Sequence, residues 1–284
     1  MIGRDALVAD LAGLDLPAGG TVLVHCAMRR VGWIDGGAAT LLAALREVIG
    51  PAGTVVVPAL TPDNSLTSPV YRAATSGMTV EQRTRYEAAM PGFDPATTAS
   101  YGVGTLAEEV RRHPDARRSR HPQTSFAALG PAAADVVRIH DLRCHLGERS
   151  PLGALYRRRA TILLLGVGMD KCTALHLAEY RLEPRIMRYS CFVADNGRRR
   201  REEFDAPALD DTDFEQAGKD LLTRPWAVPG RVGAAAVHVF PMVEAVDRAT
   251  EWFRTNRRSS AAKVDDDRVV RAHYAGSGIA AESP

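Results

Sequence analysis

The sequence has few of the features that mark membrane, nucleic-acid-binding or secreted proteins. Its formal net charge is only +2 over 284 residues, which gives no reason to expect a nucleic acid or an anionic membrane as partner. No apolar run approaches the roughly 20 residues of a membrane span, and the N-terminus has no signal-peptide core. The four cysteines are scattered without a C-x-x-C pair, which favours free thiols in a reducing compartment and argues against structural zinc. We therefore expect a cytoplasmic protein without a metal site.

The remaining composition is that of an ordinary globular protein, with 45% hydrophobic and 25% charged residues. A chain of this length forms one large domain or two small ones. Residues 21–25 and 54–58 form apolar runs typical of buried strands, and residues 38–49 between them have helical periodicity. Strand, helix and strand at this spacing predict a βαβ unit with parallel strands.

Other segments alternate between strand and helix patterns, without an internal repeat. Residues 60–100 are polar and contain several prolines, so we expect a mobile substrate loop there, with a helix near 79–89. The charged and then small, polar residues 256–284 predict a flexible tail. We further expect helices at 4–14, 102–112, 131–140 and 242–255, and strands at 125–129, 162–165, 188–195, 198–205 and 232–240, with a hairpin turn at 196–197.

The stretch 161–180 holds the best candidate for catalysis. Its apolar run ends at Gly166, and Asp170 or Thr173 can cap the helix that follows. Thr173, His176 and Glu179 are spaced by three and share one helix face. If Thr173 is the cap, the helix macrodipole keeps His176 neutral, as a general base requires. The alternative is a helical histidine that only satisfies a hydrogen bond in the core.

Two further patterns suggest binding of charged groups. A glycine-rich turn precedes the helix at 102–112, and such a helix start offers free N–H groups to an anion. The turn at 117–121 has three arginines, which suit fixed contacts to phosphate. The purely structural interpretation is a simple helix cap for the glycine-rich turn and a solvated basic turn for residues 117–121.

Six segments, in this order, resemble the aminoglycoside 3-N-acetyltransferase family. They read V-L-V-H-C-A-M-R-R-V-G with the following G-G, A-L-R-E-V-I-G-P-A-G-T-V-V-V-P, F-D-P-A-T, R-S-R-H-P-Q-T-S-F-A-A-L-G, S-P-L-G and L-L-L-G-V-G-M-D-K-C-T-A-L-H-L-A-E. The resemblance implies an α/β fold, a three-layer α/β/α arrangement with a central mixed sheet, as one domain over residues 1–255. It also implies an enzyme that uses acetyl-CoA to acetylate the 3-amino group of deoxystreptamine aminoglycosides and so confers resistance.

The resemblance implies a set of site residues as well. His176 falls on the family's catalytic histidine, and acidic residues after the hairpin, here Glu203 and Asp205, are expected to bind the cationic drug and orient the base. The substrate-binding candidates are Asp63, Asn64, Glu179 and Asp213. The coenzyme-binding candidates are His25, Arg29, Arg30, Val31, Gly32, Gly102, Gly104, Thr105, Arg118 and Ser119. Cys26 and Ala27 stand where the family often has serines.

Three alternatives stay open at this stage. The first is an acyltransferase of the same family that acts on another amine in a biosynthetic pathway. The second is a non-catalytic binding protein on the same scaffold. A covalent route through Cys172 or Cys26 is less well supported, because buried cysteine commonly serves as a small hydrophobe. The expected partners are acetyl-CoA and an aminoglycoside or other polycationic amine, without nucleic acid or membrane, in a monomer or homodimer.

Overall fold

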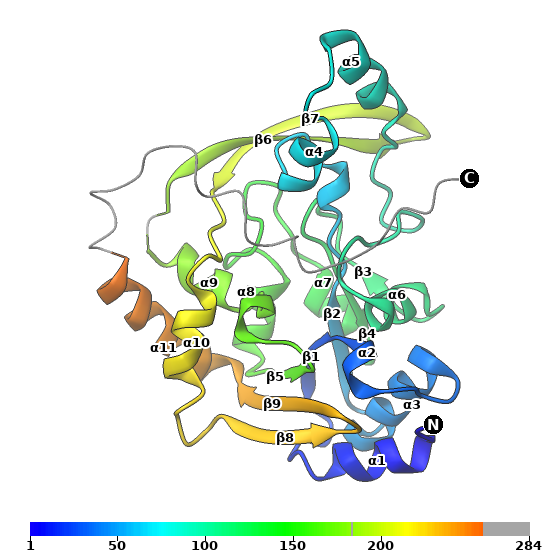
Figure 1. Ribbon diagram of the computed structural model, residues 1–284, viewed down its shortest axis with the longest axis vertical. Coiled ribbons are helices and arrows are strands. Elements are labelled where there is room, and N and C mark those ends of the chain that lie inside the picture. Colours follow the sequence, from blue (N-terminus) through cyan, green and yellow to red (C-terminus); the bar gives the residue numbers. More distant parts are fainter. Residues whose placement is uncertain (183, 258–284) are drawn as a thin grey trace.

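The centre of the molecule is a mixed sheet of seven strands (Figure 1). A computed structural model describes residues 1–182 and 184–257. The strand order is β3-β4-β2-β1-β5-β9-β8, and β1 pairs in parallel with both β2 and β5, as expected for the βαβ unit. The strands are β1 (Thr21–Cys26), β2 (Thr54–Pro58), β3 (Arg117–Arg118), β4 (Phe126–Leu129), β5 (Thr161–Leu165), β8 (Val228–Val232) and β9 (Ala235–Pro241).

Both faces of this sheet are buried under helices, which confirms the predicted three-layer α/β/α fold. In the central strand β5, Ile162 and Leu164 face one core, and Leu163 and Leu165 face the other, as the alternation of side chains along a strand requires. The first face is covered by α7 (Ala133–Val137), α8 (Pro151–Arg157), α9 (Leu175–Tyr180), α10 (Phe214–Leu221) and α11 (Met242–Asn256). The second is covered by α1 (Arg4–Ala12), α3 (Gly37–Ile49) and α6 (Thr105–Arg112).

A separate two-stranded ribbon, β6 (Ile186–Asp195) and β7 (Arg198–Pro207), lies away from the main sheet beside the 60–100 segment (Figure 1). Asn196 and Gly197 form its turn, both with positive φ, as the N-G hairpin signal predicts. The 60–100 segment contains a 3₁₀ turn at Pro62–Asn64, then α4 (Pro69–Ala74) and α5 (Val80–Ala89). Bridges from Ser65 to Cys191 and from Phe93 to Val193 attach it to the ribbon.

Several boundaries differ from those expected. Residues 232–240 were predicted as one strand; β9 accounts for residues 235–241, whereas Val232 ends β8, because Gly233, with a φ of 55°, lies in the tight turn between the two strands. The helix expected over 131–140 covers only Ala133–Val137. A short helix, α2 (Met28–Val31), lies in the loop expected after the first strand. The predicted tail lies outside the described residues, apart from Asn256, which ends α11, and Arg257.

Burial on both faces makes β5 sensitive to truncation. We expect Leu163→Ala and Leu164→Ala each to lower the free energy of unfolding by about 2–5 kcal/mol, because each leaves a cavity in a different core. Urea denaturation followed by circular dichroism measures the change. Val80→Ala is the control, since Val80 is 84% exposed and its loss should stay within about 0.5 kcal/mol. A cost at only one of the two leucines would contradict a sheet buried on both faces.

Candidate active site

The loops that follow β1 and β5 meet at one edge of the sheet. These strands are parallel neighbours, so their carboxyl ends lie at the same edge, where α/β proteins commonly bind ligands. Gly166 follows β5 with a φ of 69°, and a Cβ on it would lie 3.0 Å from the Arg30 Cβ and 3.3 Å from the Ala27 carbonyl oxygen. The close contact of these two loops therefore requires glycine at this position.

The helix that carries His176 begins later than the sequence suggested. A 3₁₀ turn at Met169–Lys171 precedes it, and Ala174 is the N-cap of α9. The expectation that Asp170 or Thr173 caps the helix is wrong, because the chain makes this extra turn first. The Thr173 hydroxyl instead lies 3.4 Å from Nε2 of His25 at the end of β1. Burial lowers the pKa of His25 to about 3, so this imidazole is neutral.

His176 and Glu179 form a buried pair on one face of α9. Nδ1 of His176 is hydrogen-bonded to Oε2 of Glu179, and the exposed fractions of the two residues are 7% and 3%. The ring of His176 packs on Phe214, with 4.7 Å between centroids. Because the carboxylate accepts the Nδ1 proton, Nε2 is left as the nitrogen that can take a proton from a ligand.

The ribbon acids Glu203 and Asp205 do not take this role. Along β7, Phe204 is buried and both acids are exposed, since neighbouring residues of a strand face opposite sides. Glu203 is paired with Arg201 at 2.9 Å, and Asp205 lies 3.3 Å from Arg188 across the ribbon. In the described part of the chain, the carboxylate bonded to the His176 ring is that of Glu179, which had been expected to contact substrate.

The other substrate candidates lie in different surroundings. Asn64 is buried, and its Nδ2 donates to the Phe192 carbonyl oxygen at 2.6 Å, so it attaches the 60–100 segment to β6 instead of facing a ligand. Asp213 precedes α10 and accepts a hydrogen bond from Arg257. Asp63, in the 3₁₀ turn after β2, is exposed and is the candidate of this set that stays open to a ligand.

The glycine turns among the coenzyme candidates have the expected backbone conformation. Gly32, Gly102 and Gly104 have φ values of 110°, 73° and 86°. Gly104 is the N-cap of α6 without a side-chain cap, which leaves the N–H groups of the first turn, beginning at Thr105, open to an anion. A Cβ on Gly104 would lie 3.1 Å from the Cys26 carbonyl oxygen, so this turn adjoins the end of β1.

Side chains on α2 add positive charge close to these turns. Arg29 and Arg30 are exposed, whereas Val31, the next residue, is buried. The backbone of Val31 is engaged too, since its carbonyl oxygen accepts from the Ala234 N–H at 2.9 Å. Of these neighbours, the two arginines can therefore reach an anionic ligand with their side chains.

Arg118 and Ser119 make hydrogen bonds to neighbouring segments of the protein. Arg118 donates to Ser125 Oγ at 2.9 Å, to the Ala59 carbonyl oxygen at 2.8 Å and to the Thr98 carbonyl oxygen, and burial lowers its pKa to about 10. Ser119 is fully buried and shares a 2.9 Å hydrogen bond with Nδ1 of His140. These contacts enclose Ser119, whereas Arg118 is only partly buried and also lines a surface cavity along the basic turn.

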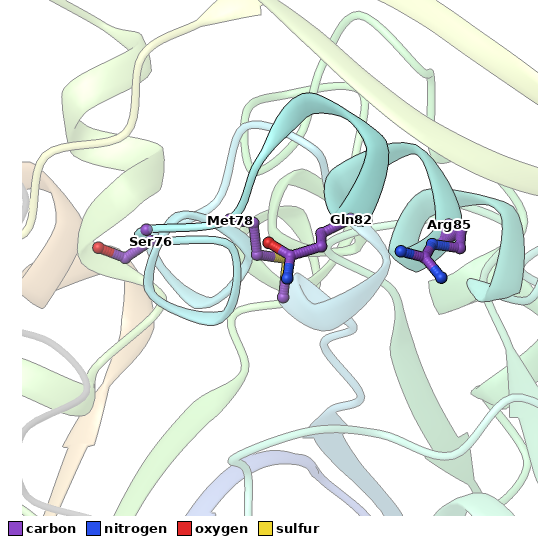
Figure 2. Close-up of a pocket in the computed structure, with 5 residues that line it drawn as sticks. Ser76, Met78, Gln82 and Arg85 are labelled. Atoms are coloured by element: carbon purple, nitrogen blue, oxygen red, sulfur yellow. The ribbon is translucent and has the colours of Figure 1, made fainter.

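Two surface cavities lie apart from the His176–Glu179 pair. One, of about 450 Å³, is formed by the turn between α4 and α5 and is lined by Ser76, Gly77, Met78, Gln82 and Arg85 (Figure 2). The other, of about 620 Å³, lies along the predicted basic turn and is lined by Pro95, Ala96, Thr97, Arg111, Arg112, His113, Ala116, Arg117 and Arg118. Neither includes His176 or Glu179.

A cluster of three histidines beside the site was not found from the sequence. His121 lies between His140 and His145, with ring centroids 4.7 and 4.5 Å apart, and His145 packs on Tyr189 of β6 at 4.3 Å. Burial lowers the pKa of all three, to about 4 for His140 and about 3 for His145. Their irregular spacing forms no motif, because separate turns bring them together.

The residues described by the structure contain no group of three or more His, Cys, Asp or Glu side chains that could hold a metal ion. In the same residues no helix combines the length and the hydrophobicity of a membrane span. Fold and site together define an α/β enzyme with a buried, hydrogen-bonded His–Glu pair and a glycine turn at the end of β1. A model of the aminoglycoside 3-N-acetyltransferase family matches residues 23–254. The chain belongs to this family of acetyl-CoA-dependent enzymes.

Individual relatives agree with this assignment. The SPbeta prophage-derived aminoglycoside N(3')-acetyltransferase-like protein YokD of Bacillus subtilis is 33% identical over 89% of this chain and 93% of its own. Its crystal structure has a TM-score of 0.82 and covers 89% of this chain and 99% of that chain. Aminoglycoside N(3)-acetyltransferase VII of Streptomyces paromomycinus is 35% identical over 88% and 91% of the two chains. AAC-IIIb, solved as a binary complex with CoASH, is 28% identical with a TM-score of 0.77, over 89% and 97%.

The histidine cluster predicts a particular loss of stability in acid. Because burial holds the folded-state pKa of His145 near 3, below the usual value of about 6.5, the unfolded chain takes up the proton first. Stability is therefore complete above about pH 6.5 and falls as the pH drops toward 4. We expect His145→Phe to flatten this dependence by about 1.4 kcal/mol per pH unit. Urea titrations at several pH values measure the free energy of unfolding. If it falls equally steeply with decreasing pH in the wild type and in His145→Phe, burial of a neutral His145 is not the cause of the loss.

Proposed function

We propose that this enzyme acetylates the 3-amino group of a deoxystreptamine aminoglycoside, with His176 as general base, and that it thereby confers resistance. The observation that carries the proposal is the buried hydrogen bond between His176 and Glu179 on α9, a helix that begins just after Thr173, whose hydroxyl lies 3.4 Å from His25 at the end of β1. This bond occupies Nδ1 and leaves Nε2 to accept a proton from a ligand. Family membership and the names of the relatives support the same reaction.

The pair suits the first requirement of acetyl transfer to an amine. An ammonium is no nucleophile, so a base must remove a proton before the amine attacks. Nε2 of His176 accepts this proton, while Glu179 keeps Nδ1 protonated and stabilises the imidazolium that forms. When bound, acetyl-CoA supplies the activated acetyl group as a thioester.

The residues that would hold the coenzyme fit an anionic ligand. Glycines at 32, 102 and 104 allow close approach of a ligand to the backbone, and the exposed Arg29 and Arg30 add positive charge. The open N–H groups of the first turn of α6 favour a phosphate oxygen. We assign coenzyme binding to these elements, with Arg118 at the surface cavity along the basic turn as a further candidate.

The charge of the ribbon favours a second candidate as well. An aminoglycoside is polycationic, so its site should carry uncompensated negative charge. Asp63 can provide some, but Glu203 and Asp205 are each paired with an arginine. This pairing supports an acyltransferase of the same family that acts on a less cationic amine in a biosynthetic pathway. A non-catalytic binding protein would have no use for a free Nε2 at the buried pair.

An amine panel tests the function and separates these candidates. The donor is acetyl-CoA and the readout is release of the free thiol. We expect gentamicin, kanamycin or apramycin to be acetylated faster than neutral amines, because the exposed carboxylate of Asp63 attracts a cationic acceptor. Mass spectrometry of the product locates the acetyl group. If a neutral amine outperforms every aminoglycoside, the biosynthetic alternative replaces resistance. No thiol release with any amine would remove the acyltransferase proposal.

Replacement of His176 tests the base. His176→Gln keeps much of the volume that packs on Phe214, so thermal melting should change little. We expect kcat to fall about 10²–10⁴-fold, as is typical for loss of a general base, while the coenzyme Kd from calorimetry stays near that of the wild type. His113→Gln, at the end of α6, is the matched control and should retain full activity. Turnover of His176→Gln within a few-fold of the wild type, with normal melting, would falsify the assignment.

A further inference from the structure

Arg257, just beyond the end of α11, reaches back to the proposed base. Its Nη1 donates to Oε1 of Glu179 at 2.5 Å, and its Nε donates to Oδ2 of Asp213 at 2.8 Å. Nη2 completes a two-point contact with Asp213, at 2.5 Å to Oδ1, and also donates to the Asp210 carbonyl oxygen at 2.8 Å. The position lies outside residues 23–254, which match the family model.

The two oxygens of Glu179 therefore serve different partners. Oε2 bonds to the His176 ring, whereas Oε1 accepts from Arg257 and, at 3.3 Å, from the Asp210 N–H. A carboxylate that is only 3% exposed is costly to bury unless a cation and hydrogen bonds compensate it. Arg257 is the cation that does so, and its contact fixes the plane in which Glu179 presents Oε2 to the imidazole.

Ring packing connects the same residues a second time. The Arg257 guanidinium lies over the Phe253 ring, 3.9 Å from its centroid. Phe253 stacks on Phe214 at 5.7 Å, and Phe214 packs against His176 at 4.7 Å. Figure 1 shows α9, α10 and α11, which carry these residues, side by side.

We propose that Arg257 is a positioning residue for the acetyl-transfer reaction, acting on His176 through Glu179. The inference rests on the proposed role of His176 as general base. Arg257 touches no reacting atom; it holds the carboxylate that orients the imidazole and balances part of that carboxylate's charge.

The charge of Arg257 has a predictable effect on proton uptake by the base. Charged or titratable groups around the His176–Glu179 pair include Asp210 and Asp213 before α10, Arg257 after α11, Tyr189 on β6 and His145 from the histidine cluster. Of these, Arg257 is the cation bonded directly to Glu179. Without it the unbalanced carboxylate holds the imidazolium more strongly, so the neutral base appears only at higher pH. The acid limb of the rate profile then moves upward.

Arg257→Met is the decisive variant, because it removes the charge and the hydrogen bonds but keeps an unbranched stem over Phe253. We expect kcat/KM at pH 7 to fall about 10- to 100-fold, as for other residues that orient a functional side chain, with the coenzyme Kd unchanged. The acid limb of kcat/KM should move to higher pH. Arg257→Lys, which restores a cation, should recover most of the limb position and part of the rate.

Arg248→Met is the matched control. Arg248 lies on α11 and bridges to Asp220 of α10 at 2.6 and 2.9 Å, much as Arg257 bridges to Asp213, but it does not contact Glu179. The control should lose stability to a similar extent and keep the wild-type pH profile. If Arg257→Met behaves like Arg248→Met, with lower melting and an unmoved acid limb, Arg257 is only a structural link and the proposal is overturned.

A second readout is independent of turnover. The Cε1–H resonance of His176, identified by its loss in His176→Gln, reports proton uptake by NMR whether or not any amine is acetylated. Its midpoint should rise in Arg257→Met, and an unmoved midpoint rejects the positioning role. A moved midpoint in a protein whose wild type acetylates no amine would instead reject the proposed function.

If Arg257→Met does not fold, Asp213→Asn takes its place. This variant should lower kcat/KM several-fold, because Asp213 holds Arg257 in position. Wild-type activity in Asp213→Asn overturns the proposal.

Discussion

The proposed chemistry depends on one buried carboxylate. Glu179 is almost inaccessible to water, and a charge in such a place is stable only with partners on both of its oxygens. His176 occupies one oxygen, while Arg257 and the Asp210 N–H occupy the other. The three helices α9, α10 and α11 are thereby joined at the point where a base is needed. Packing of the core and orientation of the base are two results of the same contact.

The sequence predicted those parts of the fold that depend on local pattern. Uniformly apolar runs identified β1, β2 and β5, because a strand covered on both faces leaves no polar position. The spacing of three between His176 and Glu179 placed both on one helix face. Local reasoning failed where a turn was inserted, as before α9 and at Gly233, since one short turn shifts the start of the helix or strand that follows.

The contacts missed from sequence are those between distant segments. Arg257 meets Glu179 across 78 residues, in a stretch whose composition resembles a tail. The histidines of the cluster come from three turns without common spacing. Charge compensation was missed for the same reason: the acids of the ribbon looked available in the sequence, but the antiparallel register places Arg188 opposite Asp205. Partners of this kind are fixed by the tertiary fold, so an acidic cluster by itself does not establish a cationic ligand.

The attachment of the 60–100 segment to the ribbon constrains how either piece can be exchanged with a relative. Asn64 exchanges two hydrogen bonds with the backbone of Phe192, and bridges at Ser65 and Phe93 extend the contact. Two pieces of chain more than 100 residues apart thus form one connected unit. A chimera that takes this segment from a relative would present it to a foreign ribbon. A stable chimera therefore calls for exchange of both pieces together, with the Asn64 position kept.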